Sequence, residues 1–117
     1  MVKTKDTIGI REVTGLMNGN GTLRFEDFMK AEDAPGHGRV FARVTIPPGG
    51  SIGYHKHEGE FETYFILDGE AVVNDNGTEY TLHSGDMEMC VSGNSHSIEN
   101  RTDEDLHIIA LIMNDLG

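Results

Sequence analysis

The sequence predicts an all-β fold, built as a sandwich or barrel of short strands. Fifteen glycines among 117 residues indicate many tight turns, and many turns imply many short strands. Turn residues separate the β-prone runs at the regular, short intervals typical of sandwiches and barrels. No segment has the apolar spacing of an amphipathic helix of three turns.

Each expected strand is a short run bounded by turn residues. The runs are Leu23–Phe28, Arg39–Ile46, Ser51–His57, Glu62–Asp68, Glu70–Val73, Thr78–Leu82, Met87–Val91, His96–Asn100 and Leu106–Met113. Asn76-Gly77 predicts a two-residue hairpin turn, because both positions tolerate positive φ. Phe25–Ala31 is compatible with one turn of helix. All 117 residues are expected to form one domain, residues 1–117, since the length suits one.

The last expected strand, Leu106–Met113, is apolar at nearly every position. A strand with two apolar faces needs cover on both sides. We therefore expect a homodimer in which a second copy supplies part of that cover.

The charge excludes two classes of partner. Twenty acidic residues against nine basic ones give a formal net charge of -11. Nucleic acids require a basic footprint, and an anionic membrane surface is disfavoured for the same reason. The single cysteine, Cys90, cannot form an intramolecular disulfide and is predicted to be a small buried hydrophobe. The first residues lack the apolar run of a signal peptide, so a cytoplasmic location is expected.

One segment combines side chains that can bind a metal. His55 and His57 are two residues apart on an expected strand, so both point to one face. Glu62 opens the next expected strand after a turn, which brings a carboxylate close to the imidazoles. His96 follows much later in the sequence, and spacing alone does not establish that it joins them.

These residues carry a family resemblance. The sequence resembles the cupin pattern G-x5-H-x-H-x4-E-x6-G, followed after a spacer by G-x5-P-x-G-x2-H-x3-N. The matching positions are Gly49, His55, His57, Glu62 and Gly69 in the first motif (49–69), and Gly85, Gly93, His96 and Asn100 in the second (85–100). Val91 stands where the family has proline.

The resemblance implies a jelly-roll-like β-barrel, the double-stranded β-helix of small single-domain bacterial cupins. It also implies that His55, His57, Glu62 and His96 bind one metal ion inside the barrel. Three imidazoles and a carboxylate suit divalent Mn, Fe, Co, Ni, Cu or Zn, and the sequence does not choose among them.

Other residues are candidates for contact with a small-molecule substrate. Tyr64 lies two residues after Glu62, so its side chain is expected to point into the barrel. It is either a core residue or a catalytic and substrate-binding one. Arg39 and Arg43 lie on an expected strand near the site, and Arg43 in particular can pair with a substrate carboxylate. Surface exposure of both arginines is the alternative.

The family resemblance leaves two kinds of function open. One is a metal-dependent enzyme acting on a small organic acid or carbonyl compound, as a decarboxylase, dioxygenase or isomerase. The other is a domain that binds or senses a small ligand through the metal without turnover. A fold does not by itself decide between them.

Overall fold

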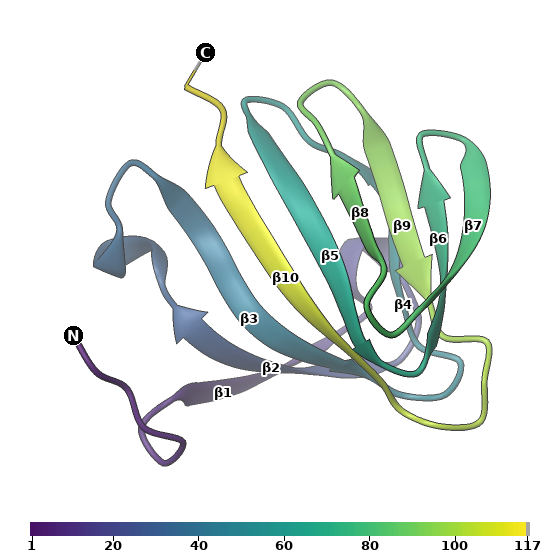
Figure 1. Ribbon diagram of the computed structural model, residues 1–117, viewed down its shortest axis with the longest axis horizontal. Helices are drawn as coiled ribbons and strands as arrows, with labels where there is room; N and C mark the ends of the chain where they lie inside the picture. Colours follow the sequence, from purple (N-terminus) through teal and green to yellow (C-terminus); the bar gives the residue numbers. More distant parts are fainter. Residues whose placement is uncertain (117) are drawn as a thin grey trace.

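The computed structural model describes residues 1–116 and consists almost entirely of antiparallel strands (Figure 1). The strands are β1 (Gly9–Thr14), β2 (Thr22–Met29), β3 (Gly38–Ile46), β4 (Ser51–Lys56), β5 (Glu60–Asp68), β6 (Glu70–Asp75), β7 (Thr78–His83), β8 (Met87–Cys90), β9 (Ser95–Glu99) and β10 (Leu106–Asn114). Two 3-10 turns, η1 (Leu16–Asn18) and η2 (Ala31–Asp33), complete the elements of these residues. The all-β prediction is confirmed.

The strands form two sheets. The larger has the order β1-β2-β3-β10-β5-β8, and the smaller has the order β4-β9-β6-β7. Neighbours within a sheet can be far apart in sequence: β10 lies between β3 and β5, as Figure 1 shows. This jelly-roll arrangement places residues from distant segments side by side.

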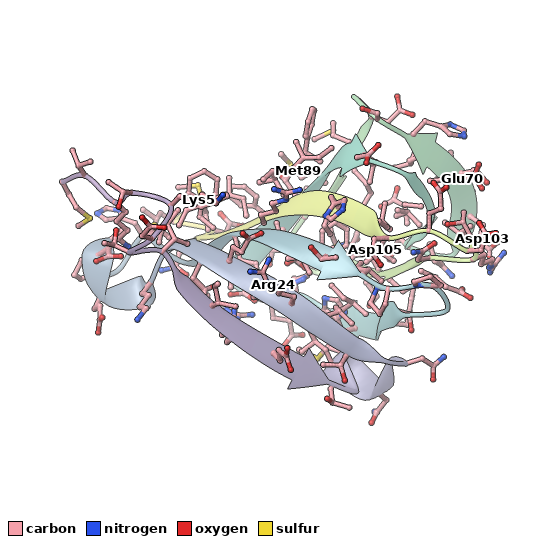
Figure 2. All side chains as sticks on the ribbon, turned by 90° about the horizontal axis from the view of Figure 1, so that it is seen from below. Lys5, Arg24, Glu70, Met89, Asp103 and Asp105 are labelled. Carbon is pink, nitrogen blue, oxygen red and sulfur yellow. The ribbon has the colours of Figure 1, made fainter. Side chains whose placement is uncertain are left out.

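The core lies between the two sheets. On β10, Ile108, Ala110 and Ile112 are buried, whereas Met113 on the opposite face remains 37% exposed. Side chains of both sheets fill the interior (Figure 2), whereas Arg24, on β2, is exposed. The fully or nearly buried apolar core comprises Leu23, Phe25, Ala42, Val44, Ile46, Ile52, Tyr64, Ile66, Ala71, Val73, Ile98, Leu106, Ile108 and Ala110.

One local expectation is wrong, and one strand was not expected. Phe25–Ala31 forms no helix, because Thr22–Met29 is strand β2, and the only helical turn nearby is η2. The sequence also gave no signal for β1. That strand pairs only with β2, and most of its side chains are exposed, so it lacks an apolar alternation.

Within residues 1–116, no helix is long and apolar enough to cross a bilayer.

Candidate metal centre and adjoining cavity

Three strands bring the four predicted residues together. His55 lies on β4 directly opposite His96 on β9, and His57 follows the end of β4. A register shift between Ile52 and His55 marks an irregularity in β4. Glu62 projects inward from β5, in the other sheet. The grouping therefore joins both sheets of the fold.

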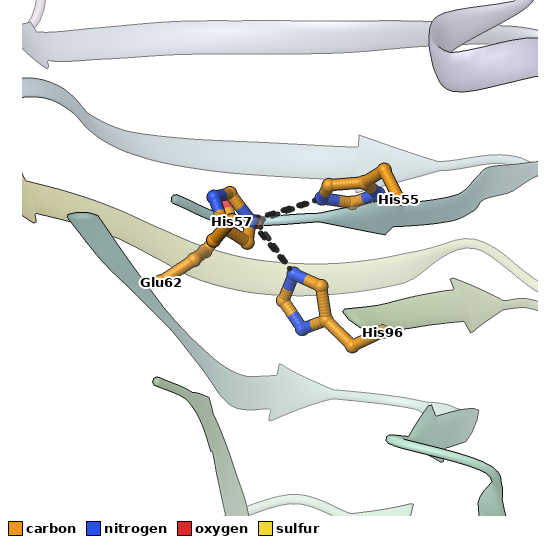
Figure 3. Close-up of side chains that lie close together, drawn as sticks. All are labelled: His55, His57, Glu62 and His96. Atoms are coloured by element: carbon orange, nitrogen blue, oxygen red, sulfur yellow. Dashed lines mark hydrogen bonds and ion pairs between the residues drawn. The ribbon is translucent and has the colours of Figure 1, made fainter. Parts of the chain in front are cut away.

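The side chains of these residues converge on one point (Figure 3). His57 Nε2 lies 3.1 Å from the Nε2 atoms of both His55 and His96. Glu62 Oε1 lies 3.0 Å from His57 Nε2 and 2.9 Å from His96 Nε2. His55 Nε2 is 3.4 Å from the same oxygen. The side chains are almost fully buried, with His55 the most accessible at 10%.

These separations match those of ligands around one transition metal ion. Two donor atoms that each lie about 2.1 Å from an ion are about 3 Å apart when they bind at right angles. The four residues form a group of donor atoms within 4.8 Å of one another. The group could therefore hold a metal ion without rearrangement of the strands.

The contacts of the three Nδ1 atoms explain why the Nε2 atoms can donate electron pairs to a metal ion. His55 Nδ1 lies 2.6 Å from the carbonyl oxygen of Gly53, and His57 Nδ1 lies 2.9 Å from Glu60 Oε1. His96 Nδ1 lies 2.8 Å from Glu88 Oε1. Each of these partners is an acceptor, so each Nδ1 carries the proton in the neutral ring. The three Nε2 lone pairs then face the centre, as metal binding requires.

Without a cation, the centre holds protons strongly. Burial alone would raise the pKa of Glu62, but hydrogen bonds with His55, His57 and His96 hold it well below its usual value. Burial opposes protonation of His96, yet its bonds to Glu62 and Glu88 raise its pKa to about 9. The bond to Glu62 likewise raises the pKa of His57. A buried carboxylate among imidazoles thus attracts positive charge, whether protons or a metal ion.

A cavity of about 100 Å³ adjoins the centre. His55, His57, Glu62 and Tyr64 form its inner end, Arg11 and Arg39 also line it, and the remaining walls are apolar: Leu16, Met17, Phe25, Val40, Ile52, Ala110 and Ile112. The cavity is smaller than the sites of drug-sized ligands. It suits a small molecule that touches the metal centre.

One wall of this cavity can form only because residue 53 is a glycine. The 3-10 turn η1 packs directly on β4, and a Cβ at Gly53 would collide with the backbone oxygen of Met17. The close approach places Leu16 and Met17 over the cavity. The carbonyl group of Gly53 also orients His55. Gly53 therefore both allows this wall to pack closely and positions a candidate metal ligand.

Both arginines of the cavity are paired. Arg39 forms two hydrogen bonds with Glu60, of 2.9 and 2.8 Å. Arg11 pairs with Asp27 in the same way and lies over the ring of Phe25. Their planar guanidinium groups retain a positive charge beside the cavity. Each charge is balanced by its carboxylate partner, so the guanidinium groups would serve an anionic ligand chiefly as hydrogen-bond donors.

Tyr64 occupies the position expected from the sequence. It is fully buried, lines the cavity and stacks on His96. Its hydroxyl forms no hydrogen bond of regular geometry within residues 1–116. Burial, followed by the nearby Glu62 charge, raises its pKa well above the usual value. The hydroxyl therefore stays protonated and remains available as a donor.

Arg43 does not join the other site residues. It lies on the outer face of β3, where its Nε is 3.7 Å from Glu26, and it is not among the residues that line the cavity. Arg39, also considered from the sequence, does line it. The histidines outside the motifs are elsewhere: His37 and His83 are exposed, and His107 contacts Thr45.

Two carboxylates of the site were missed. The sequence assigned no role to Glu60, but it connects His57 to Arg39. Glu88 is buried beside His96. Alternation along β8 offered a signal, because Glu88 shares a face with Cys90, which was expected to be buried.

The chain belongs to the cupin family, since the Cupin_2 cupin-domain model matches residues 42–112. The chain is 41% identical over 113 residues to an oxalate-binding protein of Thermotoga maritima, covering 97% of this chain and 93% of that protein.

Solved structures agree with this assignment. A crystal structure described as a predicted oxalate decarboxylase of Thermotoga maritima has a TM-score of 0.91 at 40% identity, covering 98% of this chain and 100% of that one. KdgF from a Halomonas species has a TM-score of 0.76 at 15% identity, covering 96% of this chain and 91% of the other. The second likeness shows the fold alone. The cupin barrel predicted from the sequence is thus confirmed.

Proposed function

We propose that this chain binds one divalent transition metal ion through His55, His57, Glu62 and His96, and uses it to hold a small carboxylic acid. The observation that carries the proposal is the orientation of the imidazoles. All three Nδ1 atoms face acceptors, and all three Nε2 atoms converge on the Glu62 oxygen. Three neutral imidazoles and a carboxylate suit Mn, Fe, Co, Ni, Cu or Zn.

A small acid is the ligand class that the cavity favours. Two guanidinium groups line a space of about 100 Å³ that reaches the centre. The Tyr64 hydroxyl can donate a hydrogen bond to a carboxylate oxygen there. A relative 41% identical to this chain is named an oxalate-binding protein, so oxalate is the first ligand to test.

Turnover is the second part of the proposal. The cavity gives a ligand access to the centre, and a bound metal would supply Lewis-acid chemistry to that ligand. The residues of this chain would orient the acid, donate a hydrogen bond from Tyr64 and exclude bulk water with the apolar walls. Decarboxylation, dioxygenation and isomerisation are the reaction types to test. Binding without turnover is the alternative.

Metal analysis of matched variants tests the ligand set. His57→Ala removes a buried donor and should abolish most of the bound metal, whereas His37→Ala, in an exposed loop, should retain the wild-type content. Equal losses in both variants would contradict the assignment.

Calorimetry then tests the ligand, with oxalate titrated into metal-loaded and metal-free wild type. Binding only to the loaded form is expected. Monitoring CO2 release and O2 uptake in the same samples separates an enzyme from a binding protein.

A further inference from the structure

A second group of metal-binding side chains lies on the far side of His96. One donor atom from each of Glu88, Cys90 and His96 lies within 4.8 Å of the others, and all three residues are buried. Glu88 and Cys90 point inward from β8. Asp75, at the end of β6, reaches the Glu88 carboxyl group from the other sheet.

This group contains an unused donor. Glu88 is 7% exposed, and its Oε1 accepts a hydrogen bond from His96 Nδ1. Its Oε2 is buried and forms no hydrogen bond of regular geometry within residues 1–116, and the nearby Asp75 carboxylate is of like charge. A buried carboxylate oxygen without a partner costs free energy, and a cation at this oxygen would remove that cost.

The surroundings of Cys90 are negative. Burial raises the pKa of the Cys90 thiol to about 12, and Glu88, Asp75 and Glu62 add to the effect. No Lys or Arg is among the described residues that line the adjoining cavity. A thiol in such a place is inert toward oxidants, yet the same carboxylates attract a metal cation.

A separate cavity leads to the group from the open edge of the barrel. It has a volume of about 250 Å³ and lies between β8 and the hairpin of β6 and β7. Asp75 and Glu88 line it, and Met87 and Met89 form part of its rim. Met89 projects to the surface (Figure 2). An ion can therefore approach Glu88 without passing through the first cavity.

We propose that Asp75, Glu88 and Cys90 form a second metal site, which takes a thiophilic divalent ion such as Zn²⁺ or Cd²⁺. Sulfur with carboxylate oxygens is a donor set that these ions accept. Binding would form a metal–sulfur bond and release the thiol proton to solvent. Glu88 would bind through Oε2 and keep its Oε1 bond to His96.

The second site is independent of the metal centre proposed above. The two sites share no donor atom, although Glu88 contacts His96. Failure of one proposal therefore leaves the other intact. Cys90 is the one cysteine of the chain. Any thiolate-to-metal absorption band can therefore be assigned to this residue.

Titration with Co²⁺ and Cd²⁺, followed by ultraviolet absorption, tests the proposal. The wild type should develop a thiolate-to-metal charge-transfer band and bind one ion more than Cys90→Ser, which should lack the band. His55→Ala should keep the band, because it alters only the first centre. Absence of the band at saturating metal, or its persistence in Cys90→Ser, would overturn the proposal.

Two variants of carboxylate residues complete the test without altering the thiol. Glu88→Gln should lower the affinity for the metal ion that produces the band about tenfold or more. Glu79→Gln is the matched control and should leave the titration unchanged, since Glu79, on β7, pairs with Arg101 and does not line the cavity. Equal affinities in both variants would contradict the assignment of Glu88. Near-ultraviolet circular dichroism establishes that every variant compared is folded.

Discussion

The phenol ring of Tyr64 lies parallel to the imidazole of His96, with ring centroids 4.5 Å apart and 6° between the planes. The two residues belong to different sheets, so the stack fixes the orientation of His96 from across the barrel. The arrangement also leaves the Tyr64 hydroxyl beside the centre without a regular hydrogen bond.

Tyr64→Phe should separate metal binding from ligand binding. The ring and its stack on His96 remain, so the metal content should stay at the wild-type level. Loss of the hydroxyl should weaken oxalate binding by roughly 10- to 100-fold, because a hydrogen bond to a charged group contributes about 1.5–3 kcal/mol. Calorimetry with metal-loaded protein gives the ratio, and unchanged affinity would remove Tyr64 from the binding site.

Glu60→Ala should weaken metal binding although Glu60 touches no metal. It removes the acceptor of the His57 Nδ1 proton and the partner of Arg39. A loss of about 10- to 100-fold in affinity is typical when such a support is removed. Glu58→Ala is the control, because Glu58 is 76% exposed and pairs with Lys56. Competition with a chelator measures both, and similar affinities would show that Glu60 does not orient His57.

Stability should depend on pH in opposite ways with and without metal. In the metal-free protein, hydrogen bonds raise the pKa of His96 to about 9, against burial, and that of His57 is also raised. A histidine whose pKa is raised by folding stabilises the fold fully at a pH below its pKa in the unfolded chain, about 6.5. This contribution is lost as the pH rises through the pKa of the folded state. The metal-free protein should therefore become less stable between about pH 6.5 and 9.

The metal-loaded protein should become more stable over the same interval, because protons compete with the ion for the imidazoles. Thermal unfolding with a chelator and with excess metal measures both slopes. Parallel slopes in the two samples would show that the imidazoles do not exchange protons for metal.

The outer face of the larger sheet should mediate dimerisation. Leu111 lies opposite Phe41 on one side and Thr63 on the other, and Thr63 lies opposite Met89. Phe65 pairs with Met87 in the next row. Of these side chains, Phe41, Phe65, Met87 and Met89 are exposed in a single chain, and a second copy could cover them.

Light scattering should give twice the 12.9 kDa chain mass at micromolar concentration. Phe65→Asp should shift the protein to monomer, while Ile10→Asp, on the distant edge strand β1, should not. A wild-type monomer would contradict the expectation of a homodimer.

The sequence indicated three of the clustered residues, His55, His57 and Glu62, because their spacing is local and regular. His55 and His57 share a strand face, and a short turn brings Glu62 back beside them. Joining His96 required the family resemblance, since the β4–β9 pairing spans a long stretch of chain.

Side-chain direction on β3 was harder to predict. Its apolar residues occupy both faces, Val40 and Ala42 inside and Phe41 outside, so alternation did not reveal that Arg43 points outward. Arg39 lines the cavity from the start of β3, where it pairs with Glu60. Glu88 was missed because its role depends on a partner in the opposite sheet.

The placement of the four residues on both sheets bears on how a metal ion would be exchanged. His55 and His96 come from one layer and Glu62 from the other, so an ion among them would link the layers. Removal of the ion through the adjoining cavity would break that link. An ion bound only by the closed barrel stabilises the closed state, so the metal-free barrel should open between its two layers more often than the loaded one.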